Sequence, residues 1–144
     1  MKATSFANMF VAQLQLARSE AIKRNHRVVA CRSAGGVNCA SAGGWEQGWI
    51  VFDDANNNGL RDDGELLLQR VDPLPAGWRI SGNQNVSRYI SFEPSGETRL
   101  ASGAFQAGTI TVCREQSTAS EARQIIINAV GRPRIQKSTV ASCA

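Results

Sequence analysis

One helical pattern at the N-terminus, with no second one after it, is the feature that most constrains the fold of this 144-residue chain. Between residues 3 and 25, apolar side chains recur at steps of three and four, which places them on one stripe of a helix. Basic residues crowd the C-terminal end of this segment, where cations interact favourably with the helix dipole, and Asn25 can end the helix. The apolar stripe consists of Phe6, Met9, Phe10, Leu14, Ala17, Ala21 and Ile22.

The rest of the chain has the pattern of short β-strands separated by Gly, Pro, Asn and Ser. Parallel strands need crossover helices to join them, and this part of the sequence contains no helical pattern. The sequence therefore predicts an α+β fold in which the N-terminal amphipathic helix packs on antiparallel β-sheet. The expected strands are RVVAC (27–31), WIVFD (49–53), ELLLQRV (65–71), WRIS (78–81), RYISFE (88–93), TITVC (109–113), QIIINA (124–129) and RIQKS (134–138).

Length and composition predict a single domain over residues 1–144, with the helix in 1–25 and a β-rich head in 26–144. A chain of this size can bury a core without help from a metal. Its hydrophobic content of 42% is a little below the globular average. No apolar run approaches the roughly 18 residues that cross a bilayer, so we expect the chain as given to be soluble.

The net charge of +4 is distributed unevenly along the chain. Residues 1–32 carry a net charge of +5, and residues 44–72 carry a net charge of −5. Residues 123–144 contain four basic residues and no acid. This pattern predicts an acidic loop and a basic tail with different electrostatic surfaces, and the alternative for each is an ordinary solvated face.

Four cysteines, Cys31, Cys39, Cys113 and Cys143, have no zinc-ligand spacing, and only one histidine accompanies them. In an oxidising compartment an even count favours two disulfides, and closeness along the chain favours Cys31–Cys39 and Cys113–Cys143. On the chain-entropy model, these bonds would contribute roughly 2.5 and 3.7 kcal/mol to stability. The alternative is four buried free thiols in a reducing compartment.

The segment DDANNNGLRDDGE, residues 53–65, has the ligand spacing of an EF-hand-type calcium loop. Its neighbours are predicted strands rather than helices, so the same Asn- and Gly-rich segment would also suit a tight connection between two strands. Both interpretations stay open at this point. The candidate calcium ligands are Asp54, Asn56, Asn58, Leu60, Asp62 and Glu65.

No catalytic motif accompanies any serine or cysteine, and His26 is the only histidine. It follows the helix end among basic residues, which favours a solvated side chain over a general base. The glycine-rich pieces SAGG and AGGW lack the strand–turn–helix context of phosphate-binding loops. We therefore expect no enzymatic activity, and no cofactor other than the calcium considered above.

The C-terminal sequence GRPRIQK, residues 131–137, contains two arginines two positions apart. In an extended chain Arg132 and Arg134 point to the same side, and Pro133 favours an edge strand or an exposed loop. Guanidinium groups bind phosphates through bidentate hydrogen bonds. With Lys137, the arginines would give an affinity that falls roughly thirtyfold between 50 and 200 mM salt. The alternative is that they only keep the surface soluble.

Four blocks of sequence together resemble the GspH/FimT family of minor pilins and pseudopilins. LQLARSEAIKRNHRVVAC (14–31) resembles the helix end and first strand of that family, and GWIVFDDANNNGLRDDGELL (48–67) resembles its next strand, loop and strand. ISFEPSGETR (90–99) resembles its strand and glycine turn, and QIIINAVGRPR (124–134) its last strand with a GRxR signature. The blocks follow in family order over almost the whole chain, which makes the match specific.

The resemblance implies a type IV pilin-like fold and an N-terminal hydrophobic helix that anchors prepilins in the inner membrane and later packs in the filament core. This sequence lacks that segment, so residues 3–25 would be the C-terminal half of the pilin helix. The implied partners are other minor and major pilins, through the helix, and the inner membrane, through the absent segment. The implied location is the bacterial envelope, facing the periplasm before assembly and then in the extracellular pilus, which agrees with paired cysteines.

The GRxR signature is similar to that of the FimT branch of type IV pilus minor pilins, which in naturally competent bacteria are associated with binding DNA during uptake. By position, the contacts would be Arg132 and Arg134, with Gly131 shaping the loop and Lys137 as a helper. Binding would be to phosphates and largely independent of base sequence. The alternative is a minor pilin, or a type II secretion pseudopilin, that primes or caps the filament and does not bind DNA.

Overall fold

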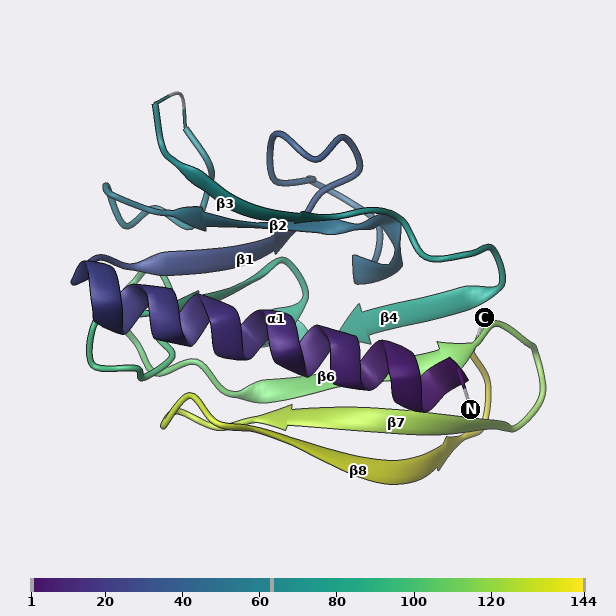
Figure 1. Ribbon diagram of the computed structural model, residues 1–144. Coiled ribbons are helices and arrows are strands. Elements are labelled where there is room, and N and C mark those ends of the chain that lie inside the picture. Colours follow the sequence, from purple (N-terminus) through teal and green to yellow (C-terminus); the bar gives the residue numbers. More distant parts are fainter. Residues whose placement is uncertain (1, 63, 144) are drawn as a thin grey trace.

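The computed structural model describes residues 2–62 and 64–143, which form one α-helix and eight β-strands (Figure 1). Helix α1 spans Lys2–Arg24, and two short 3-10 helices, η1 (Trp45–Gln47) and η2 (Gln84–Val86), lie between strands. The strands are β1 (Val28–Arg32), β2 (Trp49–Asp53), β3 (Leu67–Val71), β4 (Trp78–Gly82), β5 (Tyr89–Phe92), β6 (Gly108–Arg114), β7 (Ser120–Ile127) and β8 (Pro133–Val140).

The strands form two four-stranded sheets. The first sheet has the order β3-β2-β1-β5, and the second has the order β4-β6-β7-β8. Neighbouring strands pair antiparallel in both sheets. The predicted α+β class with antiparallel sheet is therefore confirmed, and each predicted strand overlaps an observed one.

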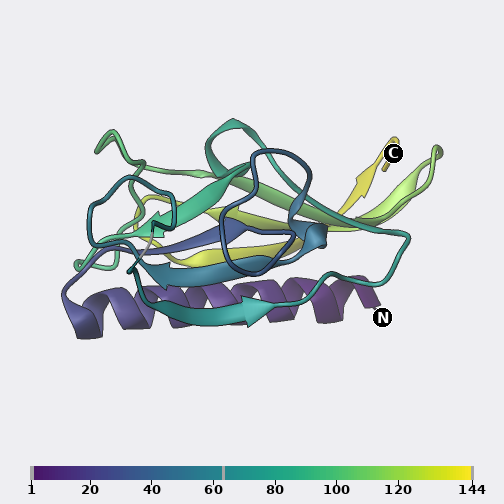
Figure 2. The same ribbon diagram turned by 90° about the horizontal axis from the view of Figure 1, so that it is seen from above.

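Helix α1 lies across both sheets and runs alongside their strands (Figures 1 and 2). It packs on β1, β2 and β5 of the first sheet and on β6, β7 and β8 of the second. The two large residues of its buried stripe lie in the middle, and alanines on both sides let the ends of the helix lie close to the sheets. The buried stripe is Ala3, Ala7, Phe10, Leu14, Ala17 and Ala21.

The predicted stripe was wrong at one position, Ile22, whose side chain is 47% exposed. It directly follows the buried Ala21, and one residue rotates the helix by roughly 100°, which turns the Ile22 side chain to solvent. Asn25 has a φ of 56° and ends the helix as predicted. None of the helices in the described part of the chain combines the length and the apolar character needed to span a membrane.

An aromatic cluster forms the centre of the shared core. Phe10 of α1 makes edge-to-face contacts with Trp45 and Trp49, with ring centroids 5.1 and 5.0 Å apart. All three side chains are buried, and the Trp45 indole donates a hydrogen bond to the Val86 carbonyl over 3.0 Å. The cluster joins α1 to η1, β2 and η2, which are far apart in sequence.

Two disulfides each link a strand to a segment that follows later in the chain. Cys31 of β1 bonds to Cys39, and Cys113 of β6 bonds to Cys143. The first disulfide belongs to an apolar cluster on the face of the first sheet opposite α1, together with Ile50. Both pairings predicted from closeness along the chain are confirmed, and they fit an oxidising compartment.

Replacing Phe10 by alanine should lower the free energy of unfolding by about 3 to 5 kcal/mol, because it would leave a cavity between α1 and the two tryptophans. Urea unfolding followed by tryptophan fluorescence measures the change. Ala12→Ser, at an exposed position of the same helix, serves as the control and should shift the value by no more than about 0.5 kcal/mol. Equal effects of the two substitutions would show that this contact does not hold the helix.

Candidate nucleic-acid interface

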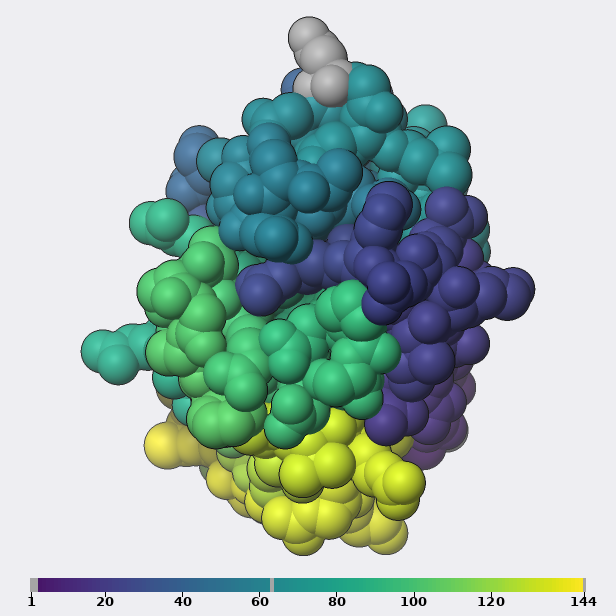
Figure 3. Space-filling model, turned by 90° about the vertical axis from the view of Figure 1, so that its left-hand side faces the viewer, coloured from purple at the N-terminus to yellow at the C-terminus, as the bar shows by residue number. Residues whose placement is uncertain are grey.

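Both loops singled out in the sequence lie at the end of the molecule where α1 finishes (Figures 1 and 3). The described residues of the segment 53–65, called here the acidic loop, form the blue-green upper part of this end in Figure 3. Residues 128–134, called here the basic turn, belong to the yellow lower part. The fold therefore places an acidic loop and a basic turn on one surface, beside the C-terminal part of α1.

The basic turn connects β7 to β8 and is hydrogen-bonded to Thr98. The Thr98 amide donates to the Ala129 carbonyl over 3.2 Å, and the Thr98 hydroxyl donates to the Asn128 carbonyl over 3.0 Å. Within the turn, the amide of Gly131 donates to the Asn128 carbonyl over 3.0 Å, and that of Arg132 donates to the Asn128 side-chain oxygen over 3.4 Å. These bonds fix the backbone just before the two arginines.

Gly131 occupies a position that excludes a side chain. Its φ is +87°, and a Cβ there would collide with the main-chain carbonyl oxygen of Gly96. That same carbonyl accepts a hydrogen bond from Nε of Arg18 over 3.1 Å. The glycine lets the basic turn lie directly on Gly96 and Arg18, and this position is compatible with the predicted role of shaping the turn.

Arg132 and Arg134 have exposed side chains, and neither forms a side-chain hydrogen bond or an ion pair with the described residues. Arg134 lies in β8, the edge strand of the second sheet, where it pairs with Ile126 of β7. Pro133 is the first residue of this edge strand, as its missing amide hydrogen requires. Because side chains alternate along an extended chain, both arginines are directed to the same side.

Lys137 does not share the surface of the arginines. Residues three apart in a strand lie on opposite faces of the sheet, so Lys137 is on the face opposite Arg134. It pairs with Arg123 of β7 and, with Glu121, lines a hollow of about 380 Å³. The structure thus brings the two predicted arginines together and separates the predicted helper from them.

Arg18 is a residue of this surface that sequence reasoning missed. It is half-buried beside the basic turn, and its Nε would lie 3.4 Å from a Cβ at Gly131. Its hydrogen-bond partner Gly96 is 78 residues away in sequence. Its position near the end of a helix indicated only an interaction with the helix dipole, so only the tertiary fold reveals its place beside Gly131 of the basic turn.

The acidic loop is folded around its own carboxylates. Asp54 is fully buried, and its Oδ2 accepts a hydrogen bond from the Gly59 amide over 2.8 Å. The exposed Asp62 accepts hydrogen bonds from the side-chain amides of Asn56 and Asn58 over 2.6 and 2.7 Å. The loop therefore has a defined conformation in which its acidic and amide side chains converge.

Burial raises the pKa of Asp54 to about 6. The hydrogen bond from Gly59 opposes this rise, and the adjoining carboxylate of Glu65 adds to it. Oδ1 of Asp54 and Oε2 of Glu65 are both buried without a hydrogen-bond partner among the described residues. The two carboxylates are therefore adjacent and incompletely satisfied.

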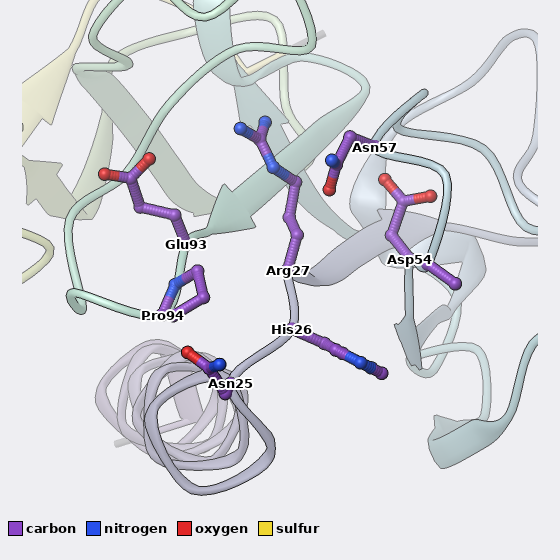
Figure 4. A pocket seen from close by; sticks show the side chains of 8 residues that line it. Asn25, His26, Arg27, Asp54, Asn57, Glu93 and Pro94 are labelled. Atoms are coloured by element: carbon purple, nitrogen blue, oxygen red, sulfur yellow. The ribbon is translucent and has the colours of Figure 1, made fainter.

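A hollow of about 310 Å³ lies between the end of α1 and the acidic loop (Figure 4). Figure 4 shows Arg27 between Glu93 on one side and Asp54 and Asn57 on the other. The Arg27 guanidinium donates a hydrogen bond to the carbonyl of Leu100 over 3.0 Å. This bond stabilises the loop that contains Leu100. This use distinguishes it from the unpaired arginines of the basic turn.

His26, predicted to be solvated, has a side chain that is 57% exposed. Its Nδ1 lies 3.0 Å from Oδ2 of Asp53, at the end of β2. Figure 4 shows the ring directed away from Arg27. The Asp53 side chain is only 11% exposed, so this half-buried contact joins the segment that follows α1 to the end of β2.

Comparisons with known proteins agree with this fold. A family model described as type II transport protein GspH matches residues 7–131. The type IV minor pilin FimU of Pseudomonas aeruginosa has a TM-score of 0.70 at 19% sequence identity, over 99% of this chain and 96% of that one. The minor pseudopilin EpsH of the Vibrio cholerae type 2 secretion system has a TM-score of 0.58 at 12% identity, over 94% and 97%. No curated protein matches the chain in sequence.

The fold is therefore that of a minor type IV pilin or pseudopilin, in which one long helix lies across antiparallel sheets. The chain belongs to the GspH family, because the family model covers most of its length, and the predicted family is confirmed. These relatives are structural pilin and pseudopilin subunits rather than enzymes. Membership implies assembly with other pilins and an association with the cell envelope or the pilus.

Replacing Gly131 by alanine should destabilise the protein by about 2 to 4 kcal/mol, because alanine is strained at this φ and its Cβ would collide with Gly96. Gly103→Ala is the matched control, since Gly103 has a φ of +94° and open space around it. The control should lose only about 1 to 2 kcal/mol. Urea unfolding measures both, and equal losses would show that the turn does not rest on Gly96.

Replacing Asp54 by asparagine should flatten the pH dependence of stability. The folded-state pKa of about 6 exceeds the ordinary value of 3.8, so the folded protein binds more protons than the unfolded chain in this range. The wild type should therefore lose stability relative to Asp54→Asn as the pH rises from about 4 to about 6. Urea unfolding in the presence of EDTA, over a pH series, measures the difference, and parallel curves would contradict a raised pKa.

Proposed function

We propose that this protein is a minor type IV pilin that is incorporated near the tip of the pilus and binds DNA through the basic turn, supporting DNA uptake in natural transformation. It resembles the FimT branch of the family in its GRxR sequence and has no catalytic role. The observation that carries this proposal is the exposure of Arg132 and Arg134 without a partner among the described residues.

Acids near the basic turn are already paired with another cation. Arg99 lies 3.0 Å from a Glu93 carboxylate oxygen and 3.9 Å from one of Glu97. These two glutamates flank the Gly96 turn on which the basic turn rests. Arg99 offsets one of their two negative charges, and these contacts direct both carboxylates to Arg99, which leaves Arg132 and Arg134 available to an external anion.

The backbone of the basic turn is arranged before any ligand binds. Gly131, the Thr98 hydrogen bonds and the pairing of β8 with β7 hold the two arginines at a defined spacing. Binding would therefore cost little conformational entropy in the backbone. Guanidinium groups can then form bidentate, charge-assisted hydrogen bonds with phosphate oxygens.

The expected binding is independent of base sequence. In the part of the chain that the structure describes, the α-helix packs its apolar stripe on both sheets. No free helix in this part can therefore enter the major groove as a recognition helix. Arg18 adds positive charge beside the turn. Contacts to phosphates alone give an affinity that depends strongly on salt.

The N-terminus of α1 and the basic turn lie at opposite ends of the molecule, which is compatible with a pilus subunit. Figure 1 shows the N-terminus of α1 at the end of the molecule opposite the basic turn. Other minor and major pilins, and the inner membrane before assembly, would be contacted from the N-terminal side of the helix. The basic turn would then face away from the filament core, in the periplasm and later outside the cell.

A purely structural role is the second candidate. The matching family model is described as a type II transport protein, and the fold is shared with the pseudopilin EpsH. A type II secretion pseudopilin, or a minor pilin that primes assembly, would need the helix and the sheets but not the arginines.

Arg132→Ala combined with Arg134→Ala should weaken binding to duplex DNA at least tenfold at about 50 mM salt, because two phosphate contacts are lost. The slope of log affinity against log salt concentration should fall by about 1.8. Fluorescence anisotropy with two unrelated sequences measures both quantities. The affinities for the two sequences should agree within a factor of about two, since phosphate contacts carry no base information.

A matched control removes the same charge elsewhere. Arg70→Ala combined with Arg114→Ala takes two exposed arginines from β3 and β6 and should leave the affinity within a factor of about three. Lys137→Ala should behave like this control, because its side chain faces away from the arginines. If the wild type fails to bind, or if the control loses as much affinity as the double variant, the basic turn is not a DNA site and the structural role stands.

A further inference from the structure

Two buried carboxylate oxygens in the acidic loop lack a hydrogen-bond donor. Asp54 is fully buried, and while its Oδ2 accepts the Gly59 amide, its Oδ1 has no partner among the described residues. Oε2 of Glu65 is also buried and also lacks a hydrogen-bond partner among the described residues. Burial of unsatisfied carboxylate oxygens is costly, and in native proteins it commonly indicates a cation or proton between them.

The other positions of the loop supply neutral oxygens at the spacing that calcium requires. Asp54 and Glu65 occupy positions 1 and 12, and the residues at positions 3, 5 and 7 are Asn56, Asn58 and Leu60. Both asparagines donate their amide nitrogens to Asp62, which turns their amide oxygens away from that carboxylate. Asp62 itself is at position 9, where the contact to calcium often passes through water.

Position 6 of the loop meets its backbone requirement. It is Gly59, whose φ of +77° gives the sharp turn that the calcium-loop spacing needs there. The ring of Tyr89 packs over this glycine, since a Cβ at Gly59 would lie 3.2 Å from the ring. The turn is thus held from outside the loop.

The two ends of the loop are also fixed. The Asp54 amide donates to the Arg27 carbonyl over 2.8 Å. Arg61 donates to the carbonyl of Val37 over 2.8 Å and to that of Glu65 over 3.1 Å. These hydrogen bonds hold the two ends of the loop in place, so the fold keeps the two carboxylates adjacent although like charges repel each other.

We propose that the acidic loop binds a calcium ion, with Asp54 and Glu65 as charged ligands and the oxygens of Asn56, Asn58 and Leu60 as neutral ones. Within residues 2–62 and 64–143, no three His, Cys, Asp or Glu side chains gather closely enough to hold a metal by themselves. A metal at this place must therefore accept amide and main-chain oxygens. Calcium takes six to eight oxygen ligands of these kinds in flexible geometry, whereas zinc prefers nitrogen and sulfur.

Calcium titration of the wild-type protein, first stripped with EDTA, tests the proposal. Isothermal calorimetry should give a single site with a dissociation constant between about 10 µM, the weak limit of sensor loops, and about 1 mM, the weak limit of extracellular ones. The melting temperature should rise by about 4 to 12 °C in 10 mM calcium chloride. The backbone amide resonance of Gly59, which bonds to Asp54, should shift on binding.

Glu65→Gln and Asp54→Asn should each weaken calcium binding at least tenfold, since each removes a charged ligand while keeping the side-chain shape. Asp72→Asn removes the same charge from an exposed carboxylate outside the loop and should leave the affinity unchanged. Far-UV circular dichroism in EDTA confirms that each variant is folded. The amide shift of Gly59 in the wild type gives a reading that needs no variant.

Absence of heat and of any shift in melting temperature would overturn the proposal and leave the two carboxylates sharing a proton. Equal effects of magnesium and calcium would also overturn it, since they would indicate general screening of the acidic loop. An unchanged affinity in Glu65→Gln would exclude this site. All these measurements are made without DNA, so their outcome is independent of the basic turn.

Discussion

The packing of α1 against both sheets is the interaction on which the rest of the structure depends. The two sheets have separate hydrogen-bonding ladders, and the buried stripe of the helix supplies a core common to both. Phe10, between Trp45 and Trp49, lies at its centre. Without this stripe each sheet would expose an apolar face, because four strands alone cannot bury their inner side chains.

The same helix determines the arrangement of the end that carries the candidate sites. Arg18 donates to Gly96, the basic turn rests on Gly96 through Gly131, and the acidic loop hydrogen-bonds to Arg27 just after α1. A change in the position of the helix would therefore move both loops. The acidic loop and the basic turn lie at this end of the molecule, while the N-terminus of the helix lies at the other end (Figure 1).

The bounds of a strand were predicted well from the sequence where they depend on neighbouring residues. They were predicted poorly where they depend on residues far away in the chain. The bounds of β2 were predicted residue for residue, since a run of large apolar residues is bounded by Gly48 and the acidic loop. In contrast, β7 begins at Ser120, four residues before the predicted run. Its first residues are polar or small, and they join the strand because β8 pairs with all of them, while β6 pairs with β7 from Ala122 onward.

By itself, the sequence predicted the fold class, the family, the exposed arginines and the calcium-loop spacing, and it favoured both disulfide pairings, because each of these depends on residue type and on spacing along the chain. Only the tertiary structure decided that Lys137 lies on the opposite face from Arg134, that Arg18 lies beneath the basic turn, and that the carboxylates of Asp54 and Glu65 adjoin. Those relations depend on strand register and on the docking of α1, which are set by contacts between residues far apart in the chain.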